Sequence, residues 1–177
     1  AIASPAAAAI LTAGAVMGQQ WRAERAQRRF IRSTFSRFVS PAVVDQLIDD
    51  PERIGRKPEL RGVTCIFTDV ASFTTFIESN RDDTDLIEKV LNKYLSGMTD
   101  LYFEHGATID KFIGDAVVGF FGGPLPADDH AERALNLSVE LDKFSEAFRR
   151  QVWEEFQITF GETRIGIHTG EVLLGNF

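Results

Sequence analysis

Cysteine and net positive charge are what this sequence lacks most clearly. Cys65 is the only cysteine among 177 residues, so no disulfide can form within the chain, which is typical of a reducing compartment. Acidic residues number 26 against 19 Lys and Arg, and the formal net charge is -7. A protein that binds nucleic acid needs a summed positive field, so we expect no nucleic-acid partner.

A complete membrane-spanning hydrophobic run is also missing. Residues 2–17 carry no charge and are rich in alanine, but this run is shorter than the roughly 20 residues that cross the hydrocarbon core. Arginines crowd the stretch after Trp21, and the positive-inside rule places such a flank in the cytoplasm. We therefore predict that residues 1–20 are the C-terminal part of a transmembrane helix in the inner (plasma) membrane, with the following domain cytoplasmic. An alanine-rich soluble helix is the alternative.

Residues 21–60 are predicted to form a cytoplasmic helical connector and linker. Apolar residues recur at helical spacing as far as Ile48, and Pro51, Gly55 and Pro58 mark the linker that follows. Residues 61–177 are then the folded domain. The hydrophobic content of the chain, 44%, is ordinary for a protein with a buried core.

Inside the domain the hydrophobic spacing alternates between extended and helical. Short β-branched and aromatic runs predict strands at residues 63–68, 107–112, 116–121 and 164–169, with a turn starting at Gly170. Amphipathic stripes predict helices at residues 82–104, capped by Asp82 or Asp83, and 126–148, capped near Asp128. This order of elements predicts an α+β fold with a ferredoxin-like βαββαβ core.

Two aspartates stand out because each follows or interrupts a β-forming run. Asp69 lies in the segment Phe67-Thr68-Asp69-Val70-Ala71-Ser72-Phe73-Thr74, and Asp115 ends the segment Lys111-Phe112-Ile113-Gly114-Asp115. On neighbouring strands the two side chains would meet at one end of the sheet. Carboxylates are the hard oxygen ligands that Mg²⁺ needs, so the pair predicts a divalent-metal site suited to nucleotide phosphates. Turn capping is the simpler interpretation of either aspartate alone.

Four sequence blocks carry a resemblance to a known family. They are Phe38-Val39-Ser40-Pro41, the Asp69 segment, Ile109-Asp110-Lys111-Phe112-Ile113-Gly114-Asp115, and Arg164-Ile165-Gly166-Ile167-His168-Thr169-Gly170-Glu171. In this order they resemble the catalytic domain of class III nucleotide cyclases, of the membrane-tethered bacterial adenylate cyclase kind. The resemblance implies an enzyme of signal transduction that converts ATP to 3′,5′-cyclic AMP and pyrophosphate.

The same resemblance implies a role for each site residue. Asp69, Asp115 and the main-chain carbonyl of Val70 would hold two Mg²⁺ or Mn²⁺ ions per site. Arg164 would contact the phosphates and act in catalysis with the two aspartates, and Lys111 would donate to adenine, which favours ATP. Two chains would form a head-to-tail homodimer with shared active sites. The remaining substrate contacts would come from the turns around the aspartates: Val70, Ala71, Ser72, Phe73, Thr74 and Gly114.

The resemblance stops at Phe177, where the family's domain continues. We therefore expect the chain as written to be a C-terminally incomplete catalytic domain with little or no activity of its own. Two alternatives stay open from the sequence. One is a non-catalytic cyclase-homology module that dimerises and transmits a signal, and the other is a guanylate cyclase, which a comparison of ATP and GTP turnover would separate.

Overall fold

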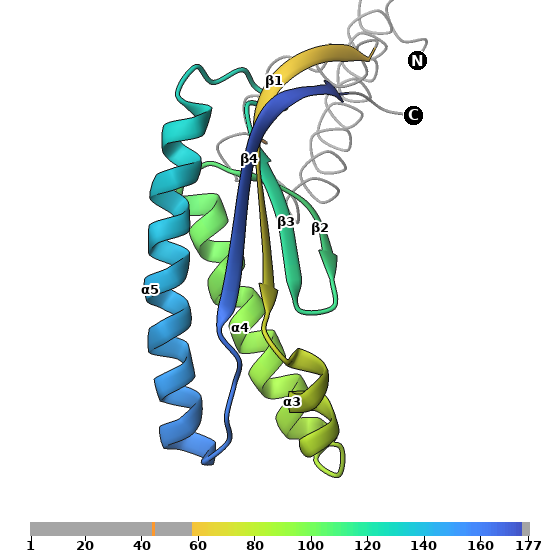
Figure 1. The fold of residues 1–177 in the computed structure, drawn as a ribbon, viewed down its shortest axis with the longest axis vertical. Helices are drawn as coiled ribbons and strands as arrows, with labels where there is room; N and C mark the ends of the chain where they lie inside the picture. The colour runs from red at the N-terminus through yellow and green to blue at the C-terminus, as the bar shows by residue number, and fades with distance from the viewer. Residues whose placement is uncertain (1–43, 45–57, 175–177) are drawn as a thin grey trace, which may run out of the picture.

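The computed structural model describes residue 44 and residues 58–174 of the chain. The predicted membrane segment at residues 1–20 and most of the connector at residues 21–60 lie outside the described residues. Among those described, no helix combines the length and the apolar character needed to cross a bilayer. The elements, in chain order, are β1 Glu59–Val70, α3 Phe73–Ser79, α4 Thr84–Glu104, β2 Thr108–Ile113, β3 Ala116–Phe121, α5 His130–Phe156 and β4 Thr163–Leu174 (Figure 1).

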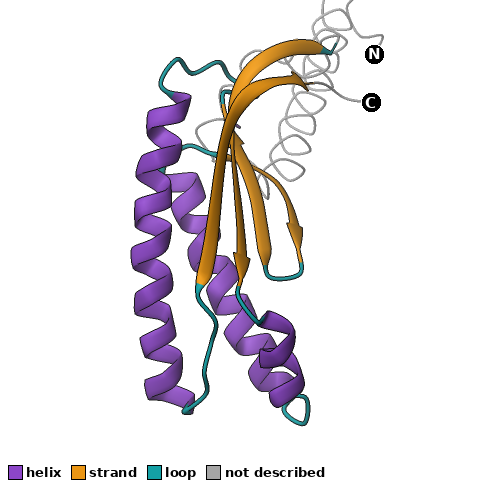
Figure 2. Ribbon diagram, viewed as in Figure 1, coloured by secondary structure: helices purple, strands orange, loops and turns teal. Residues whose placement is uncertain are grey.

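The strands form one antiparallel sheet in the order β2-β3-β1-β4. The chain passes from β1 to β2 through α3 and α4, and β3 then inserts between these two strands, which is a split βαβ arrangement. Figure 2 shows the helices gathered beside the orange sheet. The predicted α+β class and the βαββαβ order are therefore confirmed.

One face of the sheet shares an apolar core with α4 and α5. Ile66 and Val70 of β1 are buried in this core, whereas Phe67 points to the other face and is 55% exposed, as the two-residue period of a strand requires. Asp69 lies on the same face as Phe67. Helical residues in this core include Phe76, Tyr94, Met98, Tyr102, Leu137, Leu141, Phe148 and Val152.

Element lengths differ from the sequence-based expectation most clearly in β1, β4 and α5, and β1 begins at Glu59, inside the predicted linker. β1 pairs with β4 without interruption from Glu59↔Leu174 to Val70↔Thr163, so the turn predicted at Gly170 was wrong. Gly170 lies opposite the buried Val63 and continues the ladder. α5 begins at His130, after Asp129 rather than Asp128, and it extends to Phe156 because Val152 and Phe156 prolong its apolar stripe. Asp83, one of the two predicted caps of α4, accepts a hydrogen bond from the main-chain nitrogen of Leu86 at 3.0 Å.

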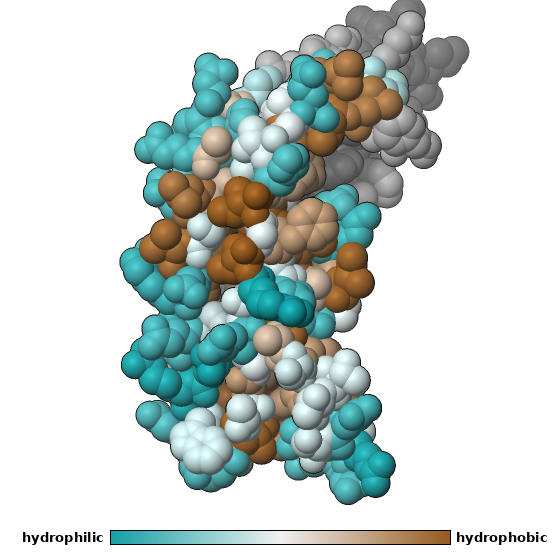
Figure 3. Space-filling view, viewed as in Figure 1, coloured by the Kyte–Doolittle hydropathy of each residue, from teal (hydrophilic) through white to brown (hydrophobic). Residues whose placement is uncertain are grey.

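Apolar side chains also reach the surface over α5 and β4. Leu135 and Val139 of α5 are 59% and 47% exposed, and Ile167 and Leu173 of β4 are 41% and 52% exposed. Figure 3 shows apolar surface, in brown, gathered over the upper part of these elements, while the lower end of this face is more polar. β4 is an edge strand of the described sheet. An apolar surface beside an unpaired edge is suited to contact with further polypeptide.

Two buried tyrosines predict a loss of stability at high pH. Burial raises the pKa of Tyr94 from 10.0 to about 12, and the carboxylates of Asp115 and Asp69 add to the shift. Burial likewise raises the pKa of Tyr102. Because the unfolded chain ionises these phenols near pH 10 while the folded chain resists ionisation, stability is intact below pH 10 and falls as pH rises toward about 12.

We therefore expect the urea midpoint of the chain to fall across this alkaline range, and Tyr94→Phe to reduce the fall. Unfolding at a series of pH values, followed by far-ultraviolet circular dichroism, measures both. A Tyr94→Phe variant that loses stability as steeply as the wild type would contradict this assignment.

Candidate metal centre

Asp115 is placed by the tight hairpin between β2 and β3. Ile113 and Ala116 pair across the hairpin, which leaves Gly114 and Asp115 as its two-residue turn. Gly114 takes a φ of 62° whereas Asp115 has a negative φ, as in a type II′ turn with glycine at its first central position. Asp115 Oδ2 accepts a hydrogen bond from the main-chain nitrogen of Val70 at 2.6 Å. This bond fixes the Asp115 carboxylate against the end of β1.

Asp69 is the second-last residue of β1 and lies opposite Arg164 of β4. Arg164 donates to both carboxylate oxygens of Asp69, from Nε to Oδ1 at 3.0 Å and from Nη2 to Oδ2. The hydrogen bond and charge of Asp69 raise the pKa of Arg164, and the charge of Asp115 acts in the same direction. The three predicted catalytic residues are thus brought to one end of the sheet. In Figure 1 the end of β1, the start of β4 and the β2–β3 turn lie at the same lower edge.

These residues fit a hard divalent cation. Asp69 and Asp115 flank the main chain of Val70, so carboxylate and carbonyl oxygens are available within one short stretch. Within residues 58–174 no group of three or more His, Cys, Asp or Glu side chains gathers as a self-sufficient metal cage. Mg²⁺ is commonly held by one or two carboxylates together with substrate phosphates and water, and not by a cage made only of protein. The pair matches that mode of binding.

The strand that follows Asp115 is fixed to β1 by a buried hydroxyl. Thr68 Oγ1 donates to the carbonyl of Val117 at 3.3 Å and accepts from the nitrogen of Val117 at 3.2 Å. Tyr102 of α4 also donates to the Val117 carbonyl, at 3.4 Å. The two carboxylates are therefore positioned by the core beneath them, and not by the surface turn alone.

The turn after Val70 leads directly into the seven-residue helix α3. Ser72, its N-cap, has a left-handed conformation with φ 58° and makes no side-chain capping hydrogen bond. The main-chain nitrogen of Ala71 donates to the carbonyl of Glu162 at 2.8 Å, which joins this turn to the segment before β4. Phe73 and Thr74 begin the helix. The predicted substrate contacts from Val70 to Thr74 thus form one continuous segment beside Asp69, and Gly114 lies in the β2–β3 turn.

Lys111 lies apart from the aspartates within one chain. It pairs with Val118 of β3, which pairs in turn with Phe67 of β1, so Lys111 shares the open face of the sheet with Phe67 and Asp69. Two strand spacings separate β2 from β1, on the order of 10 Å. Lys111 Nζ lies 3.1 Å from Asp110 Oδ2, and its side chain is 58% exposed. The structure therefore does not join Lys111 to Asp69 and Asp115 in a single chain.

The segment between α5 and β4 contributes to the site but was missed from the sequence. A Cβ atom built on Gly161 would lie 1.9 Å from the carbonyl oxygen of Ala71, so only glycine permits this approach of two main chains. The signal that could have revealed it is a glycine between Phe160 and Glu162, directly before a strand, where a close approach of another backbone is common.

The chain is an α+β domain whose two acidic side chains, Asp69 and Asp115, lie at neighbouring strand ends. The chain belongs to the family described as the adenylate and guanylate cyclase catalytic domain, whose sequence model matches residues 56–177. The predicted class III family is thereby confirmed. The match begins inside the segment predicted as a linker.

Named relatives include both kinds of cyclase. Adenylate cyclase 1 of Rhizobium meliloti is 32% identical over 147 residues, which are 81% of this chain and 21% of the relative. The solved adenylyl cyclase CyaB from P. aeruginosa is 34% identical with a TM-score of 0.64, over 69% of this chain and 62% of that chain. The solved guanylyl cyclase Cya2 is also 34% identical, with a TM-score of 0.63, over 69% of this chain and 60% of that chain. This chain thus spans less than two thirds of the length of each.

Proposed function

We propose that the chain is the catalytic domain of an adenylate cyclase that converts ATP to 3′,5′-cyclic AMP and pyrophosphate. The observation that carries the proposal is the joining of Asp69 and Asp115 at neighbouring strand ends through the main chain of Val70. The membership of the cyclase family supports it. A non-catalytic module that only dimerises has no need of two acidic side chains held at one point.

Each residue of the site has a task in this reaction. Asp69, Asp115 and the Val70 carbonyl would hold Mg²⁺ or Mn²⁺, which would supply charge to activate the ribose 3′-hydroxyl and to neutralise the β and γ phosphates. Arg164 exchanges its partner Asp69 for the phosphates and so brings positive charge to the leaving pyrophosphate. The turn from Val70 to Thr74, with Gly114 on the neighbouring hairpin, orients the triphosphate through its main chain.

The site is completed by a second copy of the chain in a head-to-tail homodimer. Lys111 lies on the same sheet face as Asp69 but two strands away, which suits it to reach the substrate held by the aspartates of a partner. Exposed apolar side chains on that face, Phe67 at 55% and Ile113 at 58%, support a covered surface. Two identical chains then build two identical sites.

The proposed preference for ATP over GTP rests on Lys111. Its ammonium group donates a hydrogen bond to the purine acceptor of adenine and repels the hydrogen-bond donors of guanine. We expect Lys111→Glu to lose about 10-fold or more in affinity for ATP and to gain relative affinity for GTP, since one charged hydrogen bond is removed and an acceptor is added. Competition of ATP and GTP for binding to the chain in the presence of Mn²⁺ measures the preference.

Lys143→Glu is the matched control, because it makes the same change of charge on the exposed side of α5. A wild-type chain that prefers GTP would replace adenylate by guanylate cyclase as the function. A chain that binds neither nucleotide with Mn²⁺ would overturn the proposed function altogether.

A further inference from the structure

The segment from Gln157 to Glu162, between α5 and β4, lies directly against the turn that follows Asp69. The nitrogen of Ala71 donates to the Glu162 carbonyl at 2.8 Å, and Gly161 meets the Ala71 carbonyl so closely that no Cβ fits between them. A cavity of about 290 Å³ lies between α3 and part of this segment and is lined by residues of both, among them Ser72, Thr75 and Thr159. Contact with the turn is therefore concentrated at Gly161 and Glu162.

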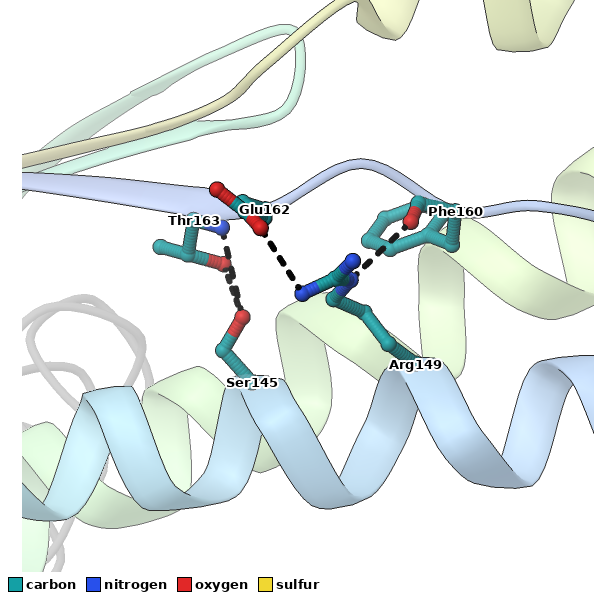
Figure 4. Close-up of polar contacts among 5 residues, drawn as sticks. All are labelled: Ser145, Arg149, Phe160, Glu162 and Thr163. Atoms are coloured by element: carbon teal, nitrogen blue, oxygen red, sulfur yellow. Dashed lines mark hydrogen bonds and ion pairs between the residues drawn. The ribbon is translucent and has the colours of Figure 1, made fainter.

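This segment is in turn held by one arginine of α5 (Figure 4). Arg149 donates from Nε to the carbonyl of Phe160 at 3.3 Å and from Nη1 to Oε1 of Glu162 at 3.4 Å. Its planar fork thus joins the residues on either side of Gly161. The figure shows the guanidinium reaching up from the helix between these two partners.

Packing and hydroxyl contacts fix the chain at Phe160 and at Thr163, on either side of Gly161 and Glu162. Phe160 is 2% exposed, and its ring meets Phe76 of α3 edge-on with centroids 5.3 Å apart. At the other end Ser145 of α5 donates to Thr163 Oγ1 at 2.7 Å, and Tyr94 of α4 lies 2.8 Å from the same oxygen. With Phe160 and Thr163 anchored to the core, Arg149 adds side-chain hydrogen bonds from α5 to the chain between them.

We infer that Arg149 and Gly161 are positioning residues of the metal and triphosphate site. Arg149 aligns the Glu162 carbonyl with the Ala71 N–H, and Gly161 allows the Ala71 main chain to approach closely. Together they orient the Val70 carbonyl and the following turn toward the proposed metal and phosphates. The inference rests on the proposed function for what the turn binds. Neither residue touches substrate, since both act through the main chain of Ala71.

The test compares Arg149→Met with the wild-type chain in the binding of Mn²⁺ together with a non-hydrolysable ATP analogue, by electron paramagnetic resonance of free Mn²⁺. Removal of a group that orients a ligand residue costs about 10- to 100-fold in metal affinity, and we expect a loss of this size. Arg149→Lys should restore part of the affinity, because a lysine can still reach one of the two acceptors. Arg150→Met, at the exposed next position of α5, is the matched control.

A second readout separates positioning from general stability. Hydrogen exchange of the Ala71 amide, followed by nuclear magnetic resonance, should become faster in Arg149→Met while the urea midpoint stays near that of Arg150→Met. Gly161→Ala should likewise weaken Mn²⁺·analogue binding and speed exchange of the Ala71 amide, and Gly62→Ala is its control because a Cβ at Gly62 meets nothing closer than 3.9 Å.

Unchanged Mn²⁺·analogue binding and unchanged Ala71 exchange in both variants would overturn the inference while leaving the proposed function intact. A wild-type chain that binds no Mn²⁺·analogue would instead overturn the proposed function. In that case hydrogen exchange of the Ala71 amide alone would test whether Arg149 positions the turn. Faster exchange in Arg149→Met and Gly161→Ala would support this role, and unchanged exchange would refute it.

Discussion

Asp115→Asn should abolish the binding of Mn²⁺·ATP by the chain, with a loss of affinity of about 100-fold or more. The substitution keeps a carbonyl oxygen that can accept from the Val70 nitrogen, so the hairpin and the end of β1 keep their geometry. What disappears is one negative charge directed at a divalent cation. The loss therefore measures the metal-binding role of the carboxylate and not the stability of the turn. Titration of Mn²⁺ in the presence of an ATP analogue gives the affinity.

Two further variants make this result specific. Asp142→Asn removes one negative charge from the exposed side of α5 and should leave Mn²⁺·ATP binding unchanged. Arg164→Gln removes the side chain that shares both oxygens of Asp69, so it should bind Mn²⁺ alone more tightly, yet bind Mn²⁺·ATP more weakly because a phosphate partner is lost. If Asp115→Asn bound Mn²⁺·ATP as well as Asp142→Asn does, the metal centre would not lie at these strand ends.

The position of the acidic pair could be predicted because it depends on local signals. The Gly114-Asp115 turn is encoded by two adjacent β-forming runs and a glycine with positive φ, and Asp69 ends a run that is buried on alternate residues. Strand order then brings both together, and the βαββαβ sequence of elements dictates that order. Helical and extended periodicities were long enough in this domain to be distinguished.

What could not be predicted depends on contacts between distant segments. The pairing of Arg164 with Asp69 follows from the register of β1 against β4, which no local pattern encodes. Gly161 likewise meets Ala71, which comes from a distant part of the sequence, and Arg149 of α5 contacts Phe160 and Glu162 beyond the end of its own helix. The uninterrupted course of β4 through Gly170 was missed for a related reason. Glycine usually signals a turn, and only the neighbouring strand determines that it continues a ladder.

Tyr102→Ala should destabilise the domain by about 3–5 kcal/mol, the usual cost of deleting a fully buried aromatic side chain. Tyr102 has no exposed surface, and its ring fills the space over Gly119 of β3, where a Cβ would come within 2.5 Å of the ring. The alanine variant loses these contacts and leaves a cavity between α4 and the sheet. Equilibrium unfolding in urea, followed by circular dichroism, measures the change.

Comparison with two other variants shows which part of the tyrosine matters. Tyr102→Phe removes only the hydroxyl that donates to Val117, so it should cost about 1 kcal/mol. Leu135→Ala, at a position 59% exposed on α5, should lower the free energy of unfolding far less than Tyr102→Ala, and an equal loss would contradict the central place of Tyr102 in the core.

Val117 lies two residues after Asp115 and is held by both Thr68 and Tyr102. The same contacts that stabilise the sheet also position Asp69 and Asp115, the two carboxylates proposed to bind the metal. Tyr102→Ala should therefore bind Mn²⁺·ATP more weakly than Leu135→Ala in the absence of urea, where both variants are folded.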